Sequence, residues 1–196
     1  MTPPPIHPNT ITAARLPLAP LAVLFLLHGG TWGVVVAAAL SLLLELTDLA
    51  DGWIARKYNV VSDFGKLFDP FSDAFCRFTL FMGLYAMGAA ELWMVLLIYY
   101  RDSSVSFLRS IAATRNIVLA ARQSGKIKAI VQGVGTQICF IAIVIGKTVP
   151  SATSIMDQVP WWTMLAMTFV TTWSFVDYMG GNRQLLAEAW RDDRAR

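Results

Sequence analysis

The stretch LTDLADGWIARKYNVVSDFGKLFDPFSDAF, residues 46–75, places four aspartates beside two long apolar runs. They are Asp48, Asp51, Asp69 and Asp73. An ionised carboxylate at membrane depth is costly, and such a side chain usually marks a functional site and has a charged partner. The fold and the chemistry of this chain are therefore both expected to depend on what holds these four charges beside apolar helices.

The composition is typical of a membrane protein. Of 196 residues, 56% are hydrophobic and 15% are charged, and the mean hydropathy is +0.53. A soluble protein with an unusually large core would need polar loops and amphipathic surfaces, which the long apolar stretches do not supply. The net charge of +3 comes from short basic clusters rather than a basic stripe, which argues against nucleic-acid binding. Cys76 and Cys139 are isolated and have no metal-ligand or disulfide spacing.

Six apolar runs are long enough to cross a bilayer, because about 20 apolar residues span its hydrocarbon core. The predicted fold is therefore all-α, a polytopic membrane protein built as a bundle of six transmembrane helices, with one domain over residues 1–196. A secretory signal is an alternative for the first run, but the capping residues Asn9 and Thr10 favour a retained helix. The tail, residues 182–196, is either an interfacial helix or a solvated end. The expected spans are residues 11–28, 31–55, 66–88, 91–114, 127–147 and 159–180.

Positive charge is distributed unevenly between the connections of these runs. The connections after the second and fourth runs, together with the tail, contain eleven Lys and Arg, whereas the other three connections contain one. By the positive-inside rule, the basic end faces the cytoplasm. The four aspartates lie at that end, so we expect a cytoplasm-facing polar cavity in an integral protein of the cell membrane.

Each pair of aspartates shares one face of its helix. Asp48 and Asp51 are three residues apart and Asp69 and Asp73 are four apart, which are the spacings of neighbours on a helix surface. The dipole of the third helix favours the second pair, whereas the first pair lies near a carboxy-terminal end, where the basic residues 56–57 offset an unfavourable dipole. Four gathered carboxylates repel one another unless protons or divalent cations neutralise them, and an all-oxygen site suits Mg²⁺ or Mn²⁺.

The residues between the acids complete a recognisable pattern. Residues 48–73 read D-x2-D-G-x2-A-R-x8-G-x3-D-x3-D. This pattern resembles the signature of the CDP-alcohol phosphotransferases, integral membrane enzymes that make phospholipids. The resemblance implies transfer of a phosphatidyl group from CDP-diacylglycerol to a polar alcohol, with release of CMP.

The resemblance also implies roles for individual residues. Asp48, Asp51, Asp69 and Asp73 would hold two divalent ions, Mg²⁺ or Mn²⁺, against the diphosphate of the donor, and Asp73 would also serve as the general base. Members of this family are commonly homodimers, so a homodimer is expected. The residues expected to bind the CDP moiety are Gly52, Ala55, Arg56 and Gly65.

Two further stretches resemble the phosphatidylglycerophosphate synthases of this family, which favours glycerol 3-phosphate as the acceptor. Asn9, Thr12 and Arg15 match an Asn-x2-Thr-x2-Arg run before the first helix, although a helix cap followed by a snorkelling arginine explains them equally well. The segment GKIKAIVQG, residues 125–133, matches the second stretch. The expected pocket for a phosphate-bearing acceptor consists of Arg109, Arg115, Lys126 and Lys128.

Other interpretations stay open at this point. Asp102 lies seven residues before Arg109 on one helix face and competes for it in a structural ion pair, and membrane anchoring explains the two lysines of the pocket equally well. Ala74 stands where these synthases tend to have Lys, with Arg77 one turn away, so inositol phosphate or another alcohol is the alternative acceptor. A cation-coupled transporter is the alternative from another class, but it predicts acids near mid-membrane and broken helices.

Overall fold

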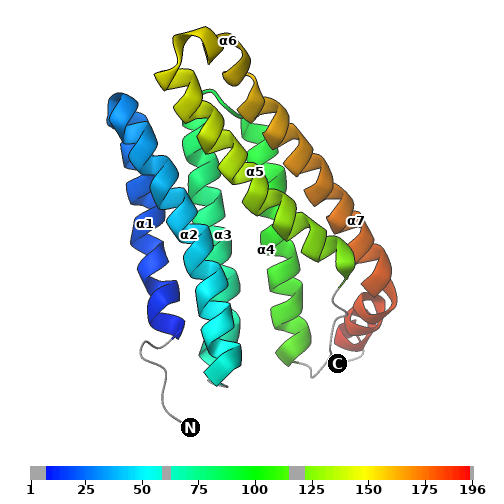
Figure 1. Ribbon diagram of the computed structural model, residues 1–196. Coiled ribbons are helices and arrows are strands. Elements are labelled where there is room, and N and C mark those ends of the chain that lie inside the picture. The colour runs from blue at the N-terminus through cyan, green and yellow to red at the C-terminus, as the bar shows by residue number, and fades with distance from the viewer. Residues whose placement is uncertain (1–7, 59–62, 115–121, 195–196) are drawn as a thin grey trace.

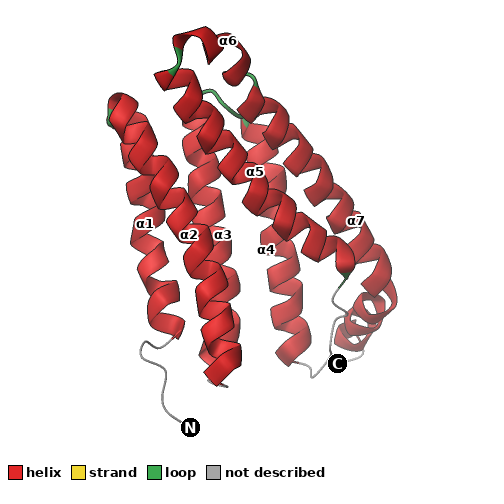
Figure 2. Cartoon of the chain, viewed as in Figure 1, coloured by secondary structure: helices red, strands yellow, loops and turns green. Residues whose placement is uncertain are grey.

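The computed structural model describes residues 8–58, 63–114 and 122–194, and within these ranges the chain is helical with short connections and no strand (Figures 1 and 2). Each of the six predicted spans overlaps one long helix, so the predicted all-α bundle is confirmed. The elements are α1 Pro8–His28, α2 Gly30–Tyr58, α3 Asp63–Ala86, α4 Leu92–Thr114, α5 Gln123–Thr148, the short η1 Pro150–Ala152 and α6 Thr153–Met156, and α7 Val159–Arg194.

Three of the long helices are apolar and long enough to cross a membrane by length and composition, namely Asn9–His28, Gly30–Ile54 and Gln123–Thr148. The other long helices contain more charge; α3 alone includes Asp69, Asp73 and Arg77. Large apolar side chains cover the outside of the bundle, and Trp32 and Phe169 are 81% and 75% exposed. An aqueous surface would not tolerate so continuous an apolar exterior, whereas lipid would.

The helices run alternately up and down, so helix ends from both halves of the chain gather at one end of the bundle (Figure 1). These are the starts of α1, α3 and α5 and the ends of α2, α4 and α7. Helix α1 packs on α2 and α3, α5 packs on α2 and α7, and α4 packs on α3 and α7. The four aspartates and most basic residues therefore share one end of the molecule, as their sequence positions predict.

A tight turn between α1 and α2 fixes the relation of these two helices. Gly30 has a φ of +59°, a conformation that suits glycine. The Gly29 amide donates to the Phe25 carbonyl at 2.9 Å, and the Gly33 amide donates to the Gly29 carbonyl at 2.8 Å. A Cβ atom on Gly33 would collide with the carbonyl oxygen of Phe25. The two helices therefore approach at the backbone level and hold α1 along α2.

We predict that Gly33→Ala destabilises the protein, because the added methyl group meets backbone atoms that cannot rotate away. The expected loss is about 1–3 kcal/mol, as for other overpacked sites. Thermal unfolding in detergent measures it. Ala39→Leu, on an exposed face of the same helix, is the control and should leave the midpoint unchanged; an equal effect of the two variants would contradict the prediction.

Candidate active site

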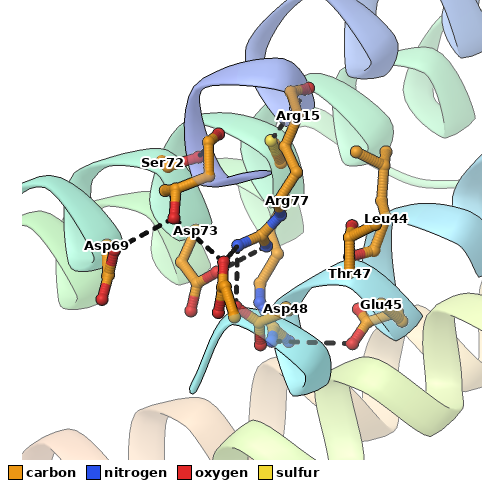
Figure 3. Close-up of polar contacts among 12 residues, drawn as sticks. Arg15, Leu44, Glu45, Thr47, Asp48, Asp69, Ser72, Asp73 and Arg77 are labelled. Atoms are coloured by element: carbon orange, nitrogen blue, oxygen red, sulfur yellow. Dashed lines mark hydrogen bonds and ion pairs between the residues drawn. The ribbon is translucent and has the colours of Figure 1, made fainter. Parts of the chain in front are cut away.

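The four aspartates, here called the acidic cluster, converge on two residues of α1. Asp48 and Asp51 come from α2 and Asp69 and Asp73 from α3. The spacing of each pair places both carboxylates on the face of the helix that meets α1. Figure 3 shows Arg15 reaching from α1 to the space between Asp48 and Asp73.

Arg15 is the cation at the centre of the acidic cluster. Its Nη1 atom donates to Asp48 Oδ1 at 2.7 Å, and its Nη2 atom donates to Asp73 Oδ1 at 2.7 Å. The same Nη1 lies 3.7 Å from Asp51 Oδ2. The Arg15 side chain is only 5% exposed. Charge-assisted hydrogen bonds of this length are strong when water is excluded, so Arg15 ties α1 to both α2 and α3.

Thr12, one helical turn before Arg15, contacts the other side of the cluster. Its hydroxyl oxygen lies 2.9 Å from Asp51 Oδ2 and 3.2 Å from Asp69 Oδ1, and the residue is fully buried. The Ser72 hydroxyl donates to the Thr12 carbonyl at 3.3 Å, which holds α3 against α1. Arg15 and Thr12 together bring all four carboxylates to one place.

The acidic cluster has the donor chemistry for a hard divalent ion, since all four side chains are carboxylates. Among the described residues, no three His, Cys, Asp or Glu side chains are grouped as a metal site. The Arg15 guanidinium lies between the carboxylates of Asp48 and Asp73, and the Thr12 hydroxyl lies between the other two carboxylates. The carboxylates therefore fit a metal in number and type. In the present arrangement, the Arg15 side chain lies among them.

A cavity of about 670 Å³ opens beside the acidic cluster. Asp69 and Asp73 form part of its wall, so the cavity begins where the cluster ends. Its opposite wall is basic and comes from α3, α4 and α5. We call it the basic cavity; its cationic residues are Arg77, Arg101, Arg109, Arg122, Lys126 and Lys128.

Lys128 and Arg101 are fixed by Asp102. The Lys128 ammonium donates to both oxygens of Asp102 at 2.8 and 2.9 Å. Arg101 donates to Asp102 at 3.0 Å and to the Ser174 hydroxyl at 2.9 Å. The pairing of Asp102 with Arg109 that the sequence allowed is wrong, because Asp102 is occupied by these two cations. Lys128 is a buried ion-pair partner as well as a residue of the cavity wall.

Arg109, Lys126 and Arg122 are more open than the two cations that Asp102 binds. Arg109 is exposed and lies over the ring of Tyr178, 5.6 Å from its centre. Lys126 is exposed at the start of α5. Arg122 forms two hydrogen bonds of 2.6 Å with Asp177, whose hydrogen bonds and charge raise the pKa of Arg122. Arg115, the fourth residue of the expected pocket, lies outside the described residues.

Comparison with known proteins identifies the family. The family model described as CDP-alcohol phosphatidyltransferase matches residues 5–173 of the chain. The chain belongs to the CDP-alcohol phosphatidyltransferase family. The resemblance based on residues 48–73 is thereby confirmed, and the protein is a membrane-embedded transferase of phospholipid synthesis.

Several curated bacterial proteins are similar to this family member. A Bacillus subtilis protein named CDP-diacylglycerol–glycerol-3-phosphate 3-phosphatidyltransferase is 36% identical over 133 residues, which cover 62% of this chain and 69% of the relative. A probable phosphatidylglycerophosphate synthase of Mycobacterium tuberculosis is 35% identical over 129 residues, which cover 64% of this chain and 61% of the relative. A Rickettsia felis protein with the same name as the Bacillus protein is 28% identical over 170 residues, which cover 86% of this chain and 92% of the relative.

The structure changes the expected electrostatics of the CDP-alcohol phosphatidyltransferase signature. Helix α2 continues to Tyr58 and α3 begins at Asp63, so the four acids lie beyond the terminal turns where the helix dipole acts. The Nζ atom of Lys57 lies over the ring of Trp53, 4.3 Å from the centre. Arg15 is a cation in direct contact with the acids.

The signature residues expected around the CDP moiety are placed in part. Gly52 follows Asp51 in α2 and is half-buried, and Gly65 is buried in the first turn of α3. Ala55 and Arg56 belong to α2, but their side chains lie outside what the structure describes. Their contact with a nucleotide stays a prediction.

Sequence reasoning undervalued Thr12 and Arg15. A helix cap and a snorkelling arginine explained them equally well, but α1 begins at Pro8, so Thr12 lies past the first turn, and Arg15 points into the bundle. The signal that finds them is their spacing of three residues, which places both on one face of α1. Arg101 and Arg122 were also missed, because only the fold brings α3, α4 and the start of α5 around one cavity.

We predict that Asp102→Asn destabilises the protein strongly, because Lys128 and Arg101 then remain buried without a carboxylate. Breaking a buried pair on one side costs about 3–5 kcal/mol. Thermal unfolding in detergent should show a lower midpoint, and adding Lys128→Met to the same chain should recover part of the loss. A midpoint equal to that of the parent protein would mean that the two cations find other partners.

Proposed function

We propose that this protein transfers the phosphatidyl group of CDP-diacylglycerol to glycerol 3-phosphate and releases CMP. The observation that carries the proposal is the basic cavity, whose wall combines Asp69 and Asp73 with a row of cations. Such a wall suits a substrate that presents both a reactive hydroxyl and a phosphate. The names of the Bacillus, Mycobacterium and Rickettsia relatives support the same acceptor.

Asp73 is our candidate for the general base. It belongs to both the acidic cluster and the cavity wall, and its side chain is 35% exposed, more than that of Asp48 or Asp51. A base must reach the hydroxyl proton through a hydrogen bond. Asp73 would take this proton while the hydroxyl oxygen forms a bond to the phosphatidyl phosphorus and the bond from that phosphorus to the CMP oxygen breaks.

We propose that Asp48, Asp51, Asp69 and Asp73 hold two divalent ions, Mg²⁺ or Mn²⁺. Bound at this position, such ions would neutralise the donor diphosphate and stabilise the departing CMP. The acids would fix the position of these ions, and through them that of the diphosphate, because they project from two helices that α1 holds together. Gly52, Ala55, Arg56 and Gly65 are proposed to border the cytidine.

The basic cavity favours an acceptor that itself bears a phosphate. Arg109 and Lys126 are exposed on its wall, and Arg77 lies one helical turn after Asp73. Figure 3 shows the ion pair of Arg77 with Glu45, whose charged atoms lie 3.9 Å apart. Arg77 would take the place of the lysine that similar synthases tend to have at the position of Ala74. Acceptors without a phosphate, such as glycerol or serine, would form weaker interactions with these cations.

The basic end of the bundle is proposed to face the cytoplasm, because the loops and tail at that end contain most of the Lys and Arg. A homodimer is also proposed, on the basis of the family alone.

We predict that Asp73→Asn lowers CMP release by at least about a hundredfold, the minimum usual for loss of a general base. The assay contains purified protein, Mg²⁺, CDP-diacylglycerol and glycerol 3-phosphate. Asp157→Asn, at the opposite end of the bundle, is the matched control and should retain full activity. Undiminished turnover by Asp73→Asn would remove the assigned base.

We predict that Arg109→Gln raises the KM for glycerol 3-phosphate about tenfold, as expected for one lost charge-assisted contact worth about 1.4 kcal/mol. The KM for CDP-diacylglycerol should stay unchanged. Lys147→Gln, at the far end of α5, is the control. The same assay with inositol phosphate, serine and glycerol identifies the acceptor, and a preference for one of these over glycerol 3-phosphate would overturn the proposed substrate.

A further inference from the structure

The Arg15 guanidinium occupies the place that the proposed function assigns to divalent ions. It is shared among Asp48, Asp51 and Asp73, at 2.7, 3.7 and 2.7 Å. It comes from α1, outside the signature that supplies the acids. A cation so placed neutralises the repulsion among the carboxylates without any metal.

Arg15 contacts two carboxylates with one hydrogen bond each, rather than one carboxylate through two parallel hydrogen bonds. Arginine pairs most strongly with one carboxylate through two parallel hydrogen bonds. Arg122 does this in the same chain, where its Nε and Nη2 atoms both bond to Asp177 at 2.6 Å. Arg15 instead divides its two Nη atoms between two helices, and its buried Nε atom has no hydrogen-bond partner among the described residues. Its pairing is therefore incomplete on one side.

An arginine whose hydrogen bonds are incomplete is easier to replace with another cation than an arginine in a bidentate ion pair. An isolated buried carboxylate is costly, so the acidic cluster needs a positive charge at all times. A divalent ion contributes twice the charge of a guanidinium and coordinates oxygen on all sides, which Arg15 does not. Both cannot occupy the space between Asp48 and Asp73.

We propose that Arg15 is an internal counter-cation that holds the acidic cluster together before metal binds and is displaced when a divalent ion enters. This inference rests on the metal site of the proposed function. It implies two opposite effects of Arg15: it stabilises the metal-free protein, and it weakens the apparent affinity for metal, because the ion must first replace it.

The test compares full-length Arg15→Gln with the parent protein in detergent. Binding of Mn²⁺ is followed by electron paramagnetic resonance of the free ion, and stability by thermal unfolding with EDTA or with Mn²⁺. We expect the Kd for Mn²⁺ to fall at least about tenfold in Arg15→Gln, which corresponds to one displaced ion pair. We also expect a lower midpoint in EDTA and a larger upward shift on adding Mn²⁺.

Arg101→Gln is the matched control, because Arg101 is also a buried arginine paired with an aspartate, but outside the acidic cluster. It should lower the midpoint equally with EDTA and with Mn²⁺ and leave the Kd unchanged. Where Arg15→Gln does not fold, Arg15→Lys retains the charge but cannot bridge two helices, and it should bind Mn²⁺ more tightly than the parent.

The outcomes distinguish failure of the counter-cation role of Arg15 from failure of the proposed metal site. Mn²⁺ binding that is unchanged or weakened in both Arg15 variants would overturn the counter-cation role and leave the metal site standing. Absence of Mn²⁺ binding in the parent protein and in all variants would overturn the metal site and the inference with it.

Discussion

Charge balance in a water-poor environment is the constraint on which this structure depends. Four carboxylates project from α2 and α3 toward α1, where Arg15 pairs directly with those of Asp48 and Asp73. The energetic reason is general: a buried charge without a partner costs far more than a hydrogen-bonded pair. The packing of α1 against α2 and α3 is therefore an electrostatic requirement as much as a hydrophobic one.

The same constraint shapes the other wall of the basic cavity. Asp102 binds Lys128 and Arg101, and Arg101 reaches Ser174 of α7, so α4, α5 and α7 are joined as α1, α2 and α3 are. The cavity lies between two ionic assemblies, one built around a cation and the other around an anion. Substrates would thus meet walls whose charges are already held in place, which is the preorganisation that charge-stabilising catalysis requires.

The helices and the acidic cluster could be predicted from the sequence because both depend on local patterns. Apolar runs define the spans, and spacings of three and four residues put Asp48 with Asp51 and Asp69 with Asp73. The partners of these charges could not be predicted, since ion pairs between helices depend on packing. Arg15 contacts residues 33 and 58 positions away, and Asp102 engages Lys128 rather than Arg109, its neighbour on the same helix face.

The glycine turn between α1 and α2 has a consequence for how quickly the site responds. Because Gly29, Gly30 and Gly33 bring the backbones into contact, α1 is not free to slide along its neighbour. A rearrangement at Arg15 is then confined to rotation about side-chain bonds. Such rotations take picoseconds to nanoseconds on exposed surfaces and are slower in packed interiors, while helix shifts occur over microseconds to milliseconds. With a rigid hairpin, the proposed exchange of Arg15 for a divalent ion would be a local event.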